Sequence, residues 1–198
     1  MTKVILSLFD YTGEWPRPYK EAGYHVIQID IKHGIDILSD DKYHVLDGLP
    51  KNSRVVGIMM APPCTDFAGS GARWWPEKDA NGTTVASVQL VREGLKTVIF
   101  YKPDWWVLEN PVGRLPKLVP ELGQPTMYFQ PCDFGDPYTK KTGLWGTFNI
   151  PKKNPVKPTE GSKMWRRYGG KSERTKELRS ITPAGFAKAF YRANSMSC

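Results

Sequence analysis

A short apolar run, Val55 to Met60, restricts the fold of this chain more than any other feature. Its six residues are too few for a typical helix, and they favour an internal strand of a sheet that is covered on both faces. Cys64 follows two prolines beyond the run, so we expect it just past the carboxyl end of that strand, where α/β sheets bind ligands. From this segment alone, an inert buried cysteine is the equal alternative.

Other apolar runs of strand length alternate with helical patterns. The first, Val4–Phe9, is followed by a turn and a helical stretch from about Pro16 to Ala22, which is the opening of a βαβ unit. Thr182 is expected to cap the last helix, with Pro183 at its first position. The order predicts one α/β domain with a Rossmann-like, mostly parallel central sheet flanked by helices. Further strands are expected at 25–30, 55–60, 105–108, 126–129 and 143–148, and further helices at 83–101 and 184–192.

Length and composition agree with one domain. A chain of 198 residues, 40% of them hydrophobic, can build one well-filled core. The three cysteines, at 64, 132 and 198, lack metal-ligand spacing, and no apolar leader follows Met1, so we expect reduced thiols in the cytoplasm. No apolar run approaches the roughly 20 residues that span a bilayer.

The positive charge is concentrated near the C-terminus. Residues 150–198 contain twelve Lys or Arg against three Asp or Glu, whereas the first 149 residues contain sixteen against seventeen. A concentrated surplus beside a nearly neutral core favours a polyanionic partner, with nucleic acid first. The alternative is a solvated basic tail that aids solubility.

Acidic residues follow two of the expected strands. Asp30 ends the second strand, where a carboxylate can accept hydrogen bonds from both hydroxyls of a ribose. The Gly-x-Gly-x-x-Gly fingerprint is absent and the first turn contains only Gly13, so a nucleoside ligand without a pyrophosphate fits better. Glu109 follows the fourth strand and should reach the same sheet edge as Cys64.

Several short motifs, spread from Leu8 to about Gly146, are more specific in their order than any one is alone. They are Leu8-Phe9 with Gly13, Asp30, Gly34-Ile35-Asp36-Ile37, Pro62-Pro63-Cys64, Glu109-Asn110-Pro111-Val112 and Gly135-Asp136-Pro137-Tyr138-Thr139-Lys140-Lys141-Thr142. In this order the chain resembles the DNA cytosine-C5 methyltransferases, in a compact form like those of phages and their hosts. The resemblance implies a single-domain methyltransferase fold that methylates C5 of cytosine in DNA.

The chemistry of that reaction gives three residues a role. C5 of cytosine is a poor nucleophile until a nucleophile adds at C6, and the resemblance makes Cys64 that nucleophile. Glu109 would hydrogen-bond N3 and the exocyclic amine, and Lys140 would lie beside the target base. Because a free thiol has a pKa of about 8.5, nearby cations must activate it, with Arg73, Lys140 and Arg114 as the candidates. A base within a duplex would have to leave the stack.

The resemblance also implies S-adenosylmethionine as the methyl donor. Phe9 would lie near its adenine, Asp30 on its ribose and Asp36 near the adenine amine. Each acid has an alternative role as a turn or cap residue. The full set of implied cofactor contacts is Phe9, Gly13, Asp30, Ile31, Asp36, Ile37 and Pro62.

The chain departs from the family pattern at several positions. Tyr11 occupies the place of the first glycine in the cofactor loop, and Thr65 stands where glutamine is usual. Lys140 with Thr142 replaces a pair of arginines in the basic motif. The roughly 30 residues from 151 to 180 are too few for a large target-recognition domain. We therefore expect a sequence specificity that is short, relaxed or supplied by another chain.

The basic segment is expected to replace that recognition domain. We divide the chain into a catalytic core at 1–150, a basic Pro/Gly-rich substrate-contacting segment at 151–180, and a C-terminal helical region at 181–198 that packs on the core. Two alternatives stay open: the same fold acting on a free pyrimidine nucleotide or RNA, and a non-catalytic nucleic-acid-binding protein. The residues expected to grip phosphates are Lys152, Lys153, Lys163, Arg166, Arg167, Lys171 and Arg174.

Overall fold

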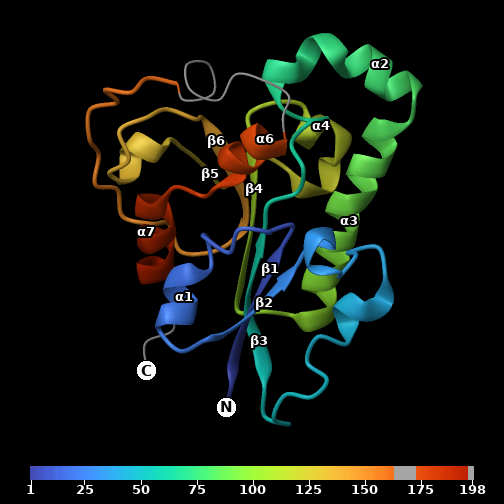
Figure 1. Cartoon of the computed structure of the whole chain (residues 1–198), viewed down its shortest axis with the longest axis vertical. Helices are drawn as coiled ribbons and strands as arrows, with labels where there is room; N and C mark the ends of the chain where they lie inside the picture. Colours follow the sequence, from blue (N-terminus) through green and yellow to red (C-terminus); the bar gives the residue numbers. More distant parts are fainter. Residues whose placement is uncertain (163–172, 196–198) are drawn as a thin grey trace.

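A six-stranded sheet runs through the computed structural model, which describes residues 1–162 and 173–195 (Figure 1). Its strands are β1 (Lys3–Leu8), β2 (His25–Ile29), β3 (Arg54–Met60), β4 (Trp105–Pro111), β5 (Met127–Phe129) and β6 (Thr142–Thr147). Their order is β2-β1-β3-β4-β6-β5. The first four strands pair in parallel, and β6 pairs antiparallel with β4 and β5. The expected α/β class with a mostly parallel sheet is confirmed.

The helices agree with the sequence pattern where apolar periodicity is strong. The long helix expected at 83–101 has those bounds, whereas the helix expected at 16–22 covers only Arg17–Glu21. The described helices are α1 (Arg17–Glu21), α2 (Trp75–Ala80), α3 (Thr83–Tyr101), α4 (Leu115–Leu118), α6 (Glu173–Ser180) and α7 (Ala184–Asn194). Short 3-10 turns are η1 (Ile31–His33), η2 (Asp40–Tyr43), η3 (Gly69–Trp74), η4 (Pro120–Leu122) and η5 (Pro131–Phe134). In the described part of the chain, no helix combines the length and the hydropathy that crossing a membrane requires.

Alternating side chains of the strands enter two apolar cores, one on each face of the sheet. Leu6 of β1 packs in the core that includes Val91 of α3. Ile5, its neighbour in sequence, packs in the core that includes Tyr19 of α1 and Phe186 of α7. Figure 1 shows α3 on one side of the strands and α1 with α7 on the other. The parallel strands are therefore covered on both faces, as their uninterrupted apolar sequences predict.

The N-terminus of α7 is capped from elsewhere in the chain. The expected cap by Thr182 is wrong, because the helix begins after Pro183 and has no cap from a neighbouring side chain. Instead the backbone N–H of Gly185 donates to Oδ2 of Asp136, at 3.0 Å. Gly185 also permits a close approach by the carbonyl of Phe134, which a Cβ at this position would strike. The cap depends on a tertiary contact that local sequence does not encode.

Candidate active site at the carboxyl edge of the sheet

The segment that carries Cys64 leaves the sheet at its carboxyl edge. The backbone N–H of Ala61 still donates to the carbonyl of Leu8, at 3.1 Å. Pro62 and Pro63 have no N–H to offer a neighbouring strand, so strand pairing stops there. The carbonyl of half-buried Cys64 then accepts from two following amides, at 3.0 and 2.9 Å, in a tight turn. The cysteine therefore lies where the sequence placed it.

The segment after Cys64 is held against the end of β4. Nδ2 of Asn110, which is fully buried, donates to the carbonyl of Pro62 at 3.0 Å. The N–H of Arg114 donates to the carbonyl of Phe67 at 2.9 Å. Gly113 makes this approach possible, because a Cβ there would overlap that same carbonyl. These contacts fix the cysteine segment relative to β4, which carries Glu109.

Glu109 and Lys140 meet beside this segment. Nζ of Lys140 lies 3.6 Å from Oε1 of Glu109, and their side chains are only 16% and 19% exposed. The same Nζ donates to the backbone carbonyl of Arg179 in α6, at 3.2 Å. The structure thus brings the three predicted catalytic residues together and adds α6 to them.

The pKa of the Cys64 thiol is raised above its ordinary value in this setting. Burial is the largest cause, because it disfavours the charged thiolate. The cation of Lys140 opposes this shift, the negative charge of Glu109 adds to it, and Arg179 opposes it more weakly than Lys140 does. The free protein therefore holds Cys64 mainly as a neutral thiol at pH 7, beside two cations that favour its ionisation.

The other two predicted activators are engaged elsewhere. The guanidinium of Arg114 donates to Oδ2 of Asp79 at 2.8 Å and lies over the ring of Trp75, 4.6 Å from its centre. The guanidinium of Arg73 lies over the ring of Trp74, at 5.0 Å. Neither arginine is among the charges that move the pKa of the thiol. Their contacts hold the turns that lead into α2 and α3.

The turn after β1 is strained and braced. Phe9 has a φ of 60°, a left-handed conformation that non-glycine residues rarely adopt and that clusters at functional sites. Asp10 accepts from the hydroxyl of Ser7 at 2.6 Å and from the N–H of Gly13 at 2.8 Å. Gln28 of β2 donates to the carbonyl of Asp10 at 2.7 Å. The turn therefore has a defined shape with Gly13 as its single glycine.

Two of the predicted cofactor-binding acids cap short turns with one oxygen each. Oδ1 of Asp30 accepts from the N–H of Lys32, and Oδ1 of Asp36 accepts from the N–H of Leu38, both at 2.9 Å. Within residues 1–162 and 173–195, the second oxygen of each carboxylate has no hydrogen-bond partner. Each acid therefore combines the turn role with an acceptor that remains available to a ligand.

The ends of three strands bring the other predicted cofactor residues together. Leu8 pairs with Ile29 on one side and with Met60 on the other, so the residues that follow these strands lie at one edge. Ile31, just beyond β2, is 73% exposed, whereas Ile37 is buried in the core on the α3 side. Available carboxylate oxygens beside an exposed apolar side chain fit the ribose and adenine of a nucleoside-type cofactor.

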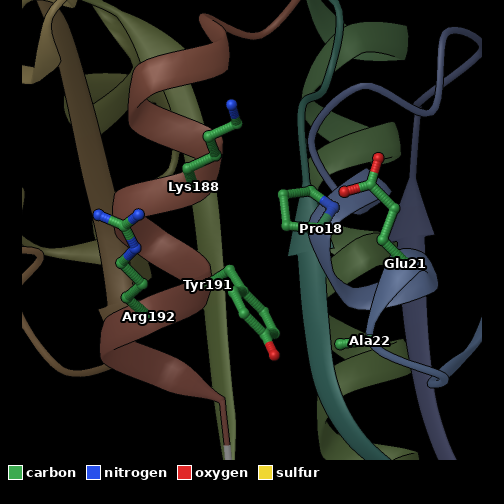
Figure 2. A pocket seen from close by; sticks show the side chains of 6 residues that line it. All are labelled: Pro18, Glu21, Ala22, Lys188, Tyr191 and Arg192. Atoms are coloured by element: carbon green, nitrogen blue, oxygen red, sulfur yellow. The ribbon is translucent and has the colours of Figure 1, made fainter.

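A surface pocket lies between α1 and α7, apart from these residues. It has a volume of about 310 Å³ and is lined by Pro18, Glu21, Ala22, Lys188, Tyr191 and Arg192 (Figure 2). None of the predicted site residues lines it. In the described residues, no group of three or more His, Cys, Asp or Glu side chains is arranged to hold a metal ion.

The basic segment is only partly described. Lys152 is exposed, and Nζ of Lys153 pairs with Oδ2 of Asp133 at 3.1 Å. Arg174 belongs to α6, so residues 173–180 form a helix where irregular chain was expected. The remaining predicted phosphate contacts, Lys163, Arg166, Arg167 and Lys171, lie outside the described residues.

Comparisons with known proteins bear on the fold. No family model and no curated protein matches the chain. Among solved structures, the chain is similar to a protein described as a candidate DNA modification methyltransferase encoded within an E. coli prophage. The TM-score is 0.53 and the identity 17%, and the match covers 78% of this chain and 52% of that one. The likeness therefore shows a shared α/β fold, with this chain spanning about half the length of the other.

Sequence reasoning missed two residues of the site. Asn110 stands inside a recognised motif, so its place beside Glu109 was a usable signal for a positioning role. Arg179 gave no signal, because α6 contains a single apolar residue, Leu178, and so shows no helical periodicity. Its place next to Lys140 follows only from the fold.

Proposed function

We propose that this chain transfers a methyl group from S-adenosylmethionine to C5 of cytosine in DNA, through a covalent adduct of Cys64. The observation that carries the proposal is the meeting of Cys64, Glu109 and Lys140, from three separate segments, at the carboxyl edge of the sheet. That edge is where α/β sheets of this kind bind ligands. The fold would then be a Rossmann-like methyltransferase fold, and the named neighbour supports DNA as the polymer.

The reaction gives each of these three residues a role. Sγ of Cys64, as thiolate, attacks C6 of cytosine, and the electrons of the C5–C6 double bond make C5 nucleophilic. Glu109, protonated when cytosine is bound, would donate to N3 and accept from the exocyclic amine, which stabilises charge that develops on the ring. Lys140 keeps a positive charge beside Cys64 and Glu109. After C5 is methylated, its proton goes to a base, the C5–C6 double bond forms again, and the bond between Sγ and C6 breaks with its electrons going to sulfur, which restores the thiolate.

The cofactor would lie beside the ends of β1, β2 and β3. The available oxygens of Asp30 and Asp36 would accept from ribose hydroxyls and from the adenine amine, and Ile31 and Phe9 would supply apolar contact. When bound there, S-adenosylmethionine supplies an electrophilic methyl group. The raised pKa of the Cys64 thiol suits this arrangement, because the free protein keeps its nucleophile protonated and less exposed to oxidation.

The decisive experiment measures transfer of a labelled methyl group to duplex DNA, single-stranded DNA, RNA and dCMP. We expect label in DNA, recovered as 5-methylcytosine when the nucleosides are analysed by mass spectrometry. Cys64→Ala should remove it, while Cys132→Ala, which alters a second half-buried cysteine, should not. Label in dCMP or RNA alone would favour the alternative substrates. Label in none of the four, or full activity of Cys64→Ala, would overturn the proposal.

A further inference from the structure

Helix α6 contacts both halves of the site, which are the cofactor side at the ends of β1 and β2 and the catalytic side around Cys64. Near its C-terminal end, Oε1 of Glu177 pairs with Nζ of Lys32 in η1 at 2.8 Å. Two residues later, the carbonyl of Arg179 accepts from Nζ of Lys140 at 3.2 Å. Figure 1 shows α6 at the end of the sheet where α4 follows β4, which is the carboxyl edge. The helix is therefore attached both to the turn after β2 and to the residues around Cys64.

The positive charge of Arg179 acts on this centre. The side chain is partly buried, its Nε is shielded from solvent, and its charge is one of two cations that act on the thiol of Cys64. Among the described residues, the other cation that acts on the thiol is Lys140, and the one carboxylate that does so is Glu109. The hydrogen bond from Nζ of Lys140 to the carbonyl of Arg179, at 3.2 Å, places residue 179 next to the ion pair of Lys140 and Glu109.

The segment before β6 supplies only one cation that acts on the thiol, which is Lys140. Its neighbour Lys141 lies over the ring of Tyr128 instead, with Nζ 5.2 Å from the ring centre. Thr142 occupies the position of the second basic residue that the family resemblance implied. It is 1% exposed, and its hydroxyl donates to the carbonyl of Lys140 at 3.0 Å. A threonine in that place is uncharged, and the second cation that acts on the thiol, Arg179, belongs to another element. In the described residues, that element is α6.

We propose that Arg179 is a positioning residue of the reactive centre, which supplies the second positive charge beside the Cys64 thiolate and holds Lys140 through its backbone carbonyl. The inference rests on the proposed function, in which the thiolate of Cys64 is the nucleophile, and adds a residue to it. It gives α6, near the end of the basic segment, a part in the chemistry as well as in the architecture.

The test follows the ionisation of Cys64 without DNA or methyl donor. Iodoacetamide alkylates the thiolate, with loss of iodide, and peptide mass spectrometry separates Cys64 from the other cysteines. We expect Arg179→Met to move the midpoint of the alkylation rate against pH upward by about 0.5 to 1 unit and to slow alkylation at pH 7.5 about three- to tenfold. Arg179→Lys should restore most of the rate. Arg192→Met, which removes the same charge from exposed α7, is the matched control and should behave as wild type.

Different outcomes would overturn the role of Arg179 and the proposed function. An unchanged midpoint in folded Arg179→Met overturns the role of Arg179, even if the wild-type protein methylates DNA. A wild-type protein that methylates nothing overturns the function, whatever the alkylation shows. If circular dichroism shows that Arg179→Met does not fold, Arg179→Gln takes its place, and the same upward shift is required. An equal shift in Arg192→Met would also overturn the inference, because it would show a general effect of net charge.

Discussion

The two halves of the site are built from different kinds of contact. On the cofactor side, Asp10, Asp30 and Asp36 each accept from a backbone amide only two or three residues along the chain. On the catalytic side, the bond from Asn110 to Pro62 joins residues 48 positions apart, and that from Lys140 to Arg179 spans 39. The acids of the first half are held mainly by local turns, although the sheet brings these turns together and Gln28 braces one of them. The contacts of the second half are all long-range. Substitutions should therefore act locally in the first half and more globally in the second.

The largest expected effect is at Cys64. With S-adenosylmethionine and DNA that contains 5-fluorocytosine, the wild-type protein should form a covalent adduct that survives denaturation, because after methylation the fluorine at C5 cannot leave as a proton does. Cys64→Ala should form none and should lose methyl transfer, while it still binds S-adenosylmethionine in calorimetry. Cys132→Ala should form the adduct normally. An adduct that maps by mass spectrometry to any residue other than Cys64 would contradict the mechanism.

Asn110 tests the long-range half. Asn110→Ala should lower the free energy of unfolding by about 2 to 3 kcal/mol, because the buried carbonyl of Pro62 loses its donor and a cavity remains. Urea unfolding followed by tryptophan fluorescence measures this loss. Methyl transfer should fall further than S-adenosylmethionine affinity does. Asn154→Ala, an exposed asparagine, is the control. Equal stability of the two variants would show that the catalytic half does not depend on this contact.

Asp30 tests the local half. Asp30→Ala should weaken S-adenosylmethionine binding by about 1 to 2 kcal/mol, as expected for the loss of a charge-assisted hydrogen bond, with little change in stability. Calorimetry measures the affinity. Asp40→Ala removes the same charge from an exposed residue of η2 and should bind normally. If both variants bind as wild type does, Asp30 serves only to cap η1.

The smallest effect is expected in the basic segment. Neutralising Arg166 and Arg167 together should weaken DNA binding about equally for all sequences and flatten the log–log dependence on salt by up to about two units. Fluorescence anisotropy over a series of salt concentrations measures the slope. Neutralising Lys188 and Arg192, which line the pocket of Figure 2, removes the same charge from α7 and should leave the slope unchanged. If the variant at Arg166 and Arg167 has wild-type affinity and slope, the basic segment is a solvated tail that does not bind DNA.

Much of the fold could be predicted because its signals are local. The apolar run at Val55–Met60 and the periodicity of α3 report on burial directly, and the acids at strand ends follow from strand boundaries. The cap of α7 by Asp136 and the place of Arg179 could not be predicted. Both depend on which distant segments meet, and nothing in the neighbouring sequence marks them. Positions set by strand boundaries were therefore easier to predict than contacts between distant segments.

The aromatic core shared by α1 and α7 has a consequence for protein synthesis. The ring of Trp15 lies 5.8 Å from the rings of both Phe186 and Phe190, and that of Tyr19 lies 4.9 Å from that of Tyr191. A ribosome makes Trp15 and Tyr19 long before Phe186, Phe190 and Tyr191. Until residues 184–194 emerge, the β1–α1–β2 unit lacks the side chains that cover the rings of Trp15 and Tyr19. The β1–α1–β2 unit thus completes its folding only after residues 184–194 have been made.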